Sequence, residues 1–333
     1  MSNGIKTDVI IVRSNGLVTD DLREKISLFC DVPVEAVIQS TNVELIYEVP
    51  LVFHEQHLDD YILKELDLED RPASKGKWRD MVKRFKDVKG DVTIGLVGKY
   101  VSLHDAYLSV TQALTDAGCE NGYKVNIKWI DAEDIEKDAS ILDGLDGIIV
   151  PGGFGSRGTE GMIMASKYAR DNHIPYFGIC YGMQIALIDI ARNKLGFKDA
   201  NSTEINPDTN YPIIDLLENQ KDIKNVGGTL RLGNYDCTIE KDSLVYSLYG
   251  QEKIKERHRH RYEFNNDFRG KIRSAGVVFS GINEDKDLVE IIELKDEDFF
   301  VACQFHPEFK SRPTKVHPLF NGFVKAVIEK KNK

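Results

Sequence analysis

Short apolar runs alternate with amphipathic stretches from residue 91 onward, and a stretch with helical spacing of its apolar residues follows each run. This alternation predicts an α/β fold, in which a parallel sheet carries helices on both faces. The predicted strands are 92–97, 124–130, 147–150 and 176–179, and the predicted helices are 105–118, 132–142, 159–172 and one from Gly182.

After about residue 210 the pattern becomes rich in strands, and an amphipathic stretch at 318–330 predicts a closing helix. The predicted strands of this part are 229–232, 235–239, 258–264, 276–282, 288–294 and 299–305. The last of them is expected to lie in the same sheet as the strand at 176–179.

The beginning of the chain has few strands. Residues 7–13 predict a buried strand, and Thr19 is expected to cap a helix with Leu22, Ile26 and Phe29 on one face. Residues 50–66 predict a second helix. This part therefore has the pattern of the tail of a larger α/β domain.

Three segments are expected along the chain: a fragment of another domain at 1–70, a linker at 71–90 and the main domain at 91–333. The linker is polar and charged, and it carries one amphipathic helix that is expected to pack between the domains. The apolar residues of this helix are Trp78, Met81, Val82 and Phe85.

The composition, 41% hydrophobic and 29% charged over 333 residues, is typical of a soluble globular protein. With 44 basic and 54 acidic residues the net charge is −10, which argues against nucleic-acid binding through a basic surface. No apolar run reaches membrane-spanning length, and the N-terminus lacks a signal peptide. The 5 cysteines include no CxxC pair, so we expect a cytoplasmic protein without disulfides or a zinc site.

A cysteine stands at a predicted strand-to-helix turn, in Gly178-Ile179-Cys180-Tyr181-Gly182. Glycines on both sides let the backbone pass closely, as in a nucleophile elbow with Cys in place of Ser. The N-terminus of the following helix favours a thiolate through its N–H groups and its positive dipole end. A buried structural cysteine is the competing interpretation.

A base for this thiol is offered by His306, in the sequence His306-Pro307-Glu308 at the end of a predicted strand. A thiol needs a base to become a thiolate, and the base needs an acid that fixes its tautomer. Pro307 is expected to keep the chain extended, so that His306 and Glu308 point the same way. A structural histidine after a strand is the alternative.

A glycine-rich loop, Gly152-Gly153-Phe154-Gly155-Ser156-Arg157-Gly158, follows the strand at 147–150. It contains G-x-G-x-x-G, but the next strand ends at Cys180, where a dinucleotide site needs an acid for the ribose. We therefore expect an oxyanion hole instead, with the N–H of Tyr181 as a second donor.

Alternating basic residues mark the stretch 256–263, where His258 and His260 share one face of a strand. Zinc is a weak alternative, because no third and fourth ligand lie near in sequence. A strand that lines an anionic ligand site is favoured over a merely solvated one.

Together, the elbow cysteine, the glycine loop and the late His-Pro-Glu resemble the class I glutamine amidotransferases, which are triad-type cysteine glutaminases. The resemblance runs from about Val92 to the C-terminus and implies a flavodoxin-like, open, mostly parallel sheet. Further sequences resemble the CTP synthase family: Gly98-Lys99-Tyr100, Asp105-Ala106-Tyr107, Ala200-Asn201-Ser202-Thr203-Glu204, the stretch 227–233 and the basic strand. The first 70 residues resemble the end of that family's ATP-dependent amidoligase domain.

The resemblance implies that Cys180 attacks the side-chain amide of L-glutamine, that His306 gives a proton to the leaving ammonia and that Glu308 orients His306. Glu204 and Arg261 suit the α-ammonium and α-carboxylate of a free amino acid. The implied glutamine-binding residues are Gly153, Phe154, Tyr181, Gly182, Met183, Gln184, Glu204 and Arg261. Tyr181 replaces the more usual Leu, but its N–H still serves the oxyanion.

For a complete enzyme the resemblance implies that ammonia reaches the amidoligase domain. There UTP, phosphorylated by ATP with Mg²⁺, becomes CTP. GTP is implied as activator and a homotetramer as the assembly. The implied nucleotide contacts are Arg13, Lys25, Thr41, Asn42 and Val43, with Asn42 in place of the usual acid, and Arg157 for GTP. Most of the amidoligase domain is missing from the sequence, so at most glutaminase activity, without a cofactor, is expected.

Two other functions stay open. One is a non-catalytic module for regulation or assembly. The other is a γ-glutamyl cysteine hydrolase of similar fold, which Glu204 and Arg261 disfavour because they suit a free amino acid.

Overall fold

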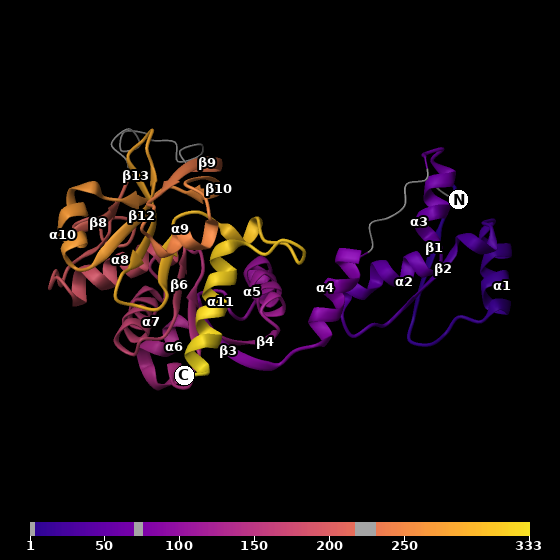
Figure 1. Cartoon of the computed structure of the whole chain (residues 1–333), viewed down its shortest axis with the longest axis horizontal. Helices are drawn as coiled ribbons and strands as arrows, with labels where there is room; N and C mark the ends of the chain where they lie inside the picture. Colours follow the sequence, from indigo (N-terminus) through magenta and orange to yellow (C-terminus); the bar gives the residue numbers. More distant parts are fainter. Residues whose placement is uncertain (1–3, 70–75, 217–230) are drawn as a thin grey trace. The chain divides into compact units, whose positions relative to one another are not determined.

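The residues described by the computed structural model are 4–69, 76–216 and 231–333. The chain divides into two compact units, Met1–Asp87 and Val88–Lys333 (Figure 1). Residues 71–75 of the predicted linker and residues 229–230 of a predicted strand lie outside the described residues.

In the first unit a parallel pair of strands is joined by a helix. β1 (Ile10–Ser14) pairs with β2 (Val37–Thr41), and α1 (Asp20–Cys30) connects them. Of the predicted apolar face of α1, Leu22 and Phe29 are 44% and 75% exposed, whereas Ile26 packs against the small core of its unit.

The stretch predicted as a single helix at 50–66 forms two, α2 (Val49–Glu55) and α3 (Leu58–Glu65). Between them His57 has a left-handed backbone conformation with φ 60°, through which an α-helix cannot continue. The side chain of Gln56 also exchanges two hydrogen bonds of 2.8 Å with the backbone of Gln39 in β2. These tertiary bonds fix the break that the helical pattern does not reveal.

The amphipathic helix of the predicted linker is α4 (Gly76–Lys86). The indole N–H of Trp78 donates to the carbonyl of Tyr47 at 2.7 Å, and the Tyr47 ring contacts Trp78 and Phe85. These contacts lie within the first unit, and packing of α4 between domains stays a prediction.

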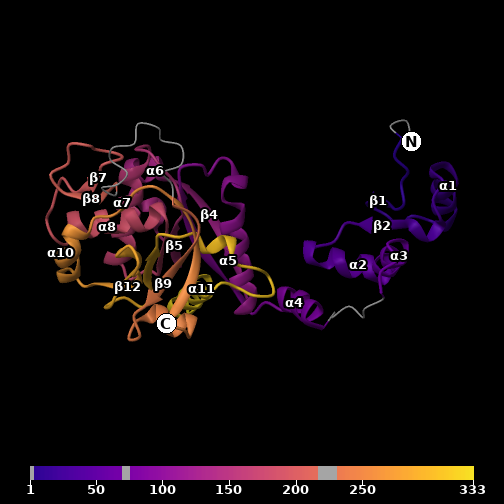
Figure 2. The same cartoon turned by 90° about the horizontal axis from the view of Figure 1, so that it is seen from above.

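The second unit is built on one nine-stranded sheet (Figure 2). In order across the sheet the strands are β10 (Lys253–His260), β9 (Arg231–Ile239), β12 (Val277–Asn283), β13 (Leu288–Leu294), β14 (Phe300–Cys303), β6 (Tyr176–Ile179), β5 (Gly147–Val150), β3 (Gly90–Gly98) and β4 (Tyr123–Asp131). The strands from β14 to β4 pair in parallel, and those from β10 to β14 pair antiparallel. The predicted α/β class with an open, mostly parallel central sheet is confirmed.

Helices cover both faces of this sheet, as the alternating pattern predicts (Figure 1). The helices are α5 (Leu108–Glu120), α6 (Ala132–Lys137), α7 (Thr159–Asp171), α8 (Tyr181–Asn193), α9 (Leu244–Tyr249), α10 (Arg269–Ser274) and α11 (Pro318–Lys331). Apolar residues of α6, α7 and α8 form one buried cluster with the sheet, and those of α5 and α11 form another.

Two predicted elements are interrupted. The helix predicted at 132–142 ends at Lys137, because Asp138 is extended and caps a separate 3₁₀ turn through a 3.0 Å bond to the N–H of Ser140. The strand predicted at 258–264 divides between β10 and β11 (Glu263–Phe264). β11 belongs to a second, three-stranded sheet with β8 (Pro212–Asp215) and β7 (Asn201–Ser202).

The parallel pairing brings the candidate chemistry together. β14 pairs with β6, and β6 pairs with β5, so the carboxyl ends of all three strands meet at one edge. Cys180 follows β6, His306 lies just beyond β14, and the glycine loop follows β5. Sites in open α/β sheets gather at this edge.

Candidate active site

Cys180 occupies a tight turn between β6 and α8. Its backbone lies at φ 51° and ψ −98°, a region that side chains rarely adopt, and its N–H donates to the carbonyl of Cys303 at 2.7 Å. A Cβ atom on Gly182 would lie 2.1 Å from the carbonyl oxygen of Val150, so only glycine fits there. The turn therefore has the form of the predicted nucleophile elbow.

His306 is paired with Glu308 beside this cysteine. Its Nδ1 lies 2.7 Å from Oε1 of Glu308, and the sulfur of Cys180 is close enough to its ring to act on its pKa. Gly152 packs against both partners, since a Cβ there would lie 2.9 Å from Cε1 of His306 and 3.7 Å from Cβ of Cys180. The structure thus brings the three predicted catalytic side chains together.

The backbone conformation between His306 and Glu308 differs from the prediction. Pro307 does not keep the chain extended, because Pro307–Phe309 forms a 3₁₀ turn. The turn places Glu308 where it accepts from Nδ1 of His306. Burial opposes the charge of His306, but the sulfur of Cys180 and the carboxylate of Glu308 outweigh it and raise its pKa to about 11. The arrangement favours the charged imidazolium form of His306.

The glycine loop is held by side chains from three directions. Lys99, at the end of β3, donates to the carbonyls of Phe154 and Gly155, at 2.9 Å for Phe154. The hydroxyl of Tyr181 donates to the same Gly155 carbonyl at 3.0 Å, and Oε1 of Glu204 accepts from the N–H of Gly155 at 3.0 Å. These bonds hold the backbone of the predicted oxyanion loop near Cys180.

Lys99 was not predicted as a site residue, although its place directly after a buried strand was a usable signal. It is 3% exposed, and its ammonium lies 4.3 Å above the ring of Tyr181. Burial, with the nearby charge of Arg157, lowers its pKa to about 8 although Glu204 acts in the opposite direction. Lys99 thus joins the loop, Tyr181 and Glu204 into one group.

A cavity of about 330 Å³ opens beside the sulfur of Cys180. Its lining residues are Gly153, Phe154, Cys180, Gln184, Glu204, Arg259, His260, Arg261 and Tyr262. The cavity has room for a small molecule and offers a carboxylate and two guanidinium groups, which suit an amino-acid zwitterion.

Three predicted glutamine-binding residues do not line this cavity. The side chain of Tyr181 turns to the glycine loop, where its hydroxyl lies 2.7 Å from Oγ1 of Thr159. Gly182 packs on Val150, and Met183 is fully buried in the apolar cluster of α8. For these three, only backbone groups remain available to a ligand.

The stretch 256–263 alternates as predicted, with His258 and His260 buried on one face. Only part of it lines the cavity, through Arg259, His260 and Arg261. In the described ranges no group of His, Cys, Asp or Glu side chains is placed to hold a metal ion. The two histidines contact each other instead, Nδ1 of His258 lying 2.9 Å from Nε2 of His260.

The predicted nucleotide contacts lie in the first unit. Arg13 is in β1, Lys25 is exposed on α1, and Thr41 ends β2. Asn42 donates to the side chain of Asn15 at 2.7 Å, and Val43 follows it. In the second unit Arg157, predicted for GTP, is paired with Glu133 at 3.0 Å and donates to the carbonyl of Lys99.

Two family descriptions match this chain. "Glutamine amidotransferase class-I" matches residues 102–326, and "CTP synthase N-terminus" matches residues 1–68. Among the described helices, none is long and apolar enough to cross a membrane.

Curated relatives and a solved structure agree with these matches. A CTP synthase of Clostridium acetobutylicum is 51% identical over 332 residues, which are 99% of this chain and 62% of that protein. A CTP synthase of Bacillus subtilis is 50% identical over 333 residues, with the same shares of 99% and 62%. The chain thus spans less than two thirds of the length of these relatives.

The solved glutaminase domain of Trypanosoma brucei CTPS, with bound acivicin, matches with a TM-score of 0.68 and 36% identity, covering 72% of this chain and 94% of that one. The class-I match at residues 102–326 includes the elbow, the glycine loop and the His-Pro-Glu turn. The chain therefore belongs to the class-I glutamine amidotransferase family and, within it, to the CTP synthases.

Proposed function

We propose that this chain hydrolyses the side-chain amide of L-glutamine and supplies ammonia, with Cys180 as the nucleophile. The observation that carries the proposal is that Cys180 and His306 lie together beside Gly152, with His306 2.7 Å from Glu308, at the wall of the cavity that Glu204 and Arg261 line. Arg261 pairs with the substrate α-carboxylate, and Glu204 pairs with its α-ammonium. A general cysteine hydrolase has no need of that pair.

The reaction follows from the geometry. The Cys180 sulfur attacks the amide carbon, and the developing oxyanion is held by the N–H groups of Tyr181 and Gly153. His306 gives its proton to the amide nitrogen, the C–N bond breaks, and ammonia leaves a thioester on Cys180. Water, deprotonated by His306, then cleaves the thioester, so glutamate leaves and the thiolate is restored. Glu308 keeps Nδ1 of His306 protonated throughout.

For the whole protein we propose the synthesis of CTP, as the name of its relatives says. The proposed reaction is the amination of UTP with ATP and Mg²⁺, in a homotetramer that GTP activates. Arg13, Lys25, Thr41, Asn42 and Val43 are the proposed nucleotide contacts of this chain, and Arg157 is proposed for GTP. A reducing cytoplasm is the proposed compartment, because the sequence has 5 cysteines and no CxxC pair.

The deciding experiment is intact-mass labelling of the 333-residue chain with 6-diazo-5-oxo-L-norleucine, with and without GTP, followed by peptide mapping. We expect one adduct, on Cys180, and none in Cys180→Ala. Labelling that persists in Cys180→Ala would overturn the proposal. Labelling that requires GTP would support the proposed role of GTP as activator.

Two alternatives have their own outcomes. A non-catalytic module would bind nucleotide or a partner chain and leave the analogue unreacted. A γ-glutamyl hydrolase would prefer peptide γ-glutamyl substrates to free glutamine. The charged pair Glu204 and Arg261 at the cavity favours free glutamine over both.

A further inference from the structure

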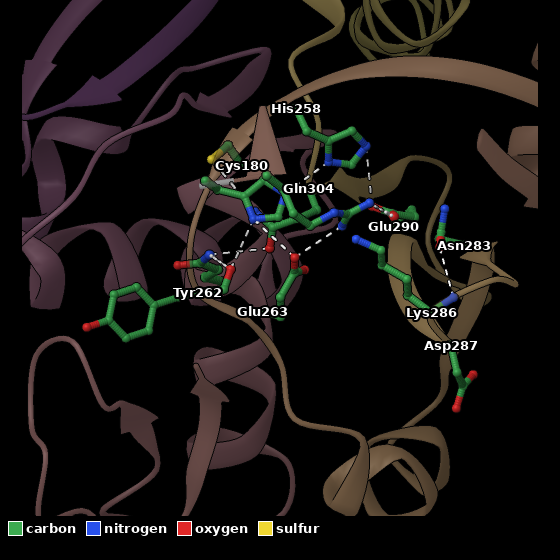
Figure 3. Close-up of polar contacts among 12 residues, drawn as sticks. Cys180, His258, Tyr262, Glu263, Asn283, Lys286, Asp287, Glu290 and Gln304 are labelled. Carbon is green, nitrogen blue, oxygen red and sulfur yellow. Dashed lines mark hydrogen bonds and ion pairs between the residues drawn. The ribbon is translucent and has the colours of Figure 1, made fainter. Parts of the chain in front are cut away.

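A buried glutamine, Gln304, contacts the sulfur of Cys180 from the side of β14. Its Nε2 lies 3.7 Å from the sulfur, and the side chain is 1% exposed (Figure 3). Its backbone is fixed as well, because its N–H donates to the carbonyl of Glu290 at 2.8 Å. Sulfur is a large, weak acceptor, so a donor at this distance favours the charged thiolate over the neutral thiol.

The orientation of this amide is determined by its neighbours. Nε2 of Gln184 lies 3.1 Å from the carbonyl oxygen of Tyr262, which can only accept, so Gln184 presents its NH₂ group there. The same Nε2 lies 3.3 Å from Oε1 of Gln304. Oε1 of Gln304 therefore accepts, and its NH₂ group faces the sulfur of Cys180.

The Tyr262 carbonyl is held in turn by the two buried histidines. Nδ1 of His260 lies 3.2 Å from that carbonyl and must donate, so Nε2 of His260 accepts from Nδ1 of His258 at 2.9 Å. Nε2 of His258 lies 3.5 Å from Glu290. Figure 3 shows this run of contacts from Cys180 and Gln304 to His258 and Glu290.

A cluster of buried ion pairs lies at the end of this run of contacts that is farthest from Cys180. Arg231 is 3.1 Å from Glu263 and 2.7 Å from Glu290, and all three side chains are buried. The donor and acceptor roles are fixed from Nδ1 of His258 through His260 and the Tyr262 carbonyl to Gln304, whereas Nε2 of His258 and Oε2 of Glu290 have no hydrogen-bond partner among the described residues. The amide of Gln304 thus has little freedom to flip, and the donor toward the sulfur is preorganised.

We propose that Gln304 is a positioning residue for the nucleophile: its amide N–H, oriented by Gln184 and the Tyr262 carbonyl, stabilises the thiolate of Cys180. This inference rests on the proposed function, in which Cys180 attacks as a thiolate. It also joins the cavity to the nucleophile, because Gln184 lines the cavity and contacts Gln304.

Other titratable and charged groups lie near the same sulfur. His306 lies beside it, with Glu308 behind, and the thiol of Cys303 is buried nearby. Glu204, Arg259 and Arg261 face it across the cavity. The test therefore compares variants of Gln304 alone, in which all these charges remain.

The test measures how the rate of Cys180 alkylation by iodoacetamide depends on pH, in the full chain, with the adduct located by peptide mapping. Gln304→Met keeps the length of the side chain and removes the donor. We expect the midpoint pH of alkylation to rise by about 1–2 units, the equivalent of one hydrogen bond to a charged group. Gln304→Glu, which brings a carboxylate to the sulfur, is expected to raise it at least as far.

Gln251→Met is the matched control, since Gln251 is exposed and lies outside the run of contacts. Its midpoint should equal that of the unaltered chain. If Gln304→Met and Gln304→Glu both unfold at the control's temperature and keep its midpoint, Gln304 is only structural and the inference is overturned. If Gln304→Met does not fold, the midpoint in Gln304→Glu decides.

The two proposals fail in different ways. Iodoacetamide needs no glutamine site, so the midpoint tests Gln304 whether or not the glutamine analogue labels Cys180. Labelling by the analogue together with an unchanged midpoint would overturn only the inference. An absence of labelling together with a raised midpoint would overturn the proposed function and leave the contact between Gln304 and the sulfur supported.

Discussion

At the scale of single residues, the candidate site depends on a few side chains that hold backbone rather than substrate. Tyr181 directs its ring under the ammonium of Lys99 and its hydroxyl to the carbonyl of Gly155. Its own N–H is the proposed oxyanion donor, so one residue both supplies a donor and fixes the loop that supplies the other. A leucine at this position has no hydroxyl with which to bond the loop.

Tyr181→Phe tests this role, because it removes the hydroxyl and keeps the ring. The bond to the Gly155 carbonyl at 3.0 Å is lost, at a cost of about 1 kcal/mol, or roughly fivefold. We expect labelling by 6-diazo-5-oxo-L-norleucine to slow by that factor, while alkylation by iodoacetamide keeps its rate. Tyr168→Phe is the control, since its hydroxyl bonds Asp143 on the surface. Equal labelling rates in both variants would show that the hydroxyl does not order the loop.

At the scale of elements, the site exists because strands and helices approach more closely than side chains allow. A Cβ on Gly178 would lie 2.7 Å from the backbone of Gly182, and one on Gly161 of α7 would lie 1.8 Å from the carbonyl of Ala132. These contacts bring α7 onto α6 and set the first turn of α8 against β6. The parallel register of β6 with β14 then fixes the separation of Cys180 and His306.

Gly182→Ala is expected to destabilise the second unit, since its Cβ would meet the buried carbonyl of Val150 at 2.1 Å. Overpacking of this kind costs about 1–3 kcal/mol. Urea unfolding followed by tryptophan fluorescence should show a lower midpoint. Gly270→Ala in α10 is the control, because nothing lies within 4 Å of a Cβ there. A Gly182→Ala chain as stable as this control would show that α8 can move away from β5.

At the scale of the whole molecule, buried ionisable groups link stability to pH. Burial, with the charge of Arg231, lowers the pKa of His260 to about 3, and the same causes together with His260 lower that of His258 still further. Burial and Glu290 raise the pKa of Glu263 to about 8 against the pull of Arg231. The two histidines therefore make the free energy of unfolding depend on pH under acidic conditions, and Glu263 does so under alkaline conditions.

The signs predict a stability maximum between these limits. The stabilisation of the folded state by the two neutral histidines is fully present above pH 6.5 and is lost as pH falls toward about 3. In this range the histidines of the unfolded chain bind protons, and those of the folded chain do not. The contribution of Glu263 is fully present below pH 4.5 and is lost as pH rises through about 8. His306 adds to the alkaline loss, since its stabilisation is present below pH 6.5 and disappears as pH rises through about 11.

Free energies of unfolding from urea titrations at several pH values check this prediction. His258→Gln should reduce the slope of the free energy of unfolding against pH by up to about 1.4 kcal/mol per pH unit on the acid side of the maximum. Glu263→Gln should reduce the slope on the alkaline side. His173→Asn is the control, because its imidazole is 71% exposed and Asn tolerates the left-handed backbone there. If the slopes are unchanged in His258→Gln and Glu263→Gln, other groups govern the pH dependence of stability.

The sequence by itself predicted the alternating strands and helices from β3 to α8 and the three candidate catalytic residues, but not β7, β8, α9 and α10. Period and glycine spacing are local properties, and parallel β/α alternation brings the carboxyl ends of strands to one edge. Cys180, His306 and Glu308 could therefore be predicted together from positions far apart in the chain. Their resemblance to a family added the proposed partners and roles.

Only the tertiary structure decided which residues support that chemistry. Helix 50–66 is broken because Gln56 bonds the backbone of Gln39, a contact that no local pattern contains. Lys99 and Gln304 reach the glycine loop and the sulfur through hydrogen bonds between distant segments. Local sequence specifies periodicity, but the partner of a buried polar group depends on which segments the fold brings together, and that is decided only when the whole sheet has formed.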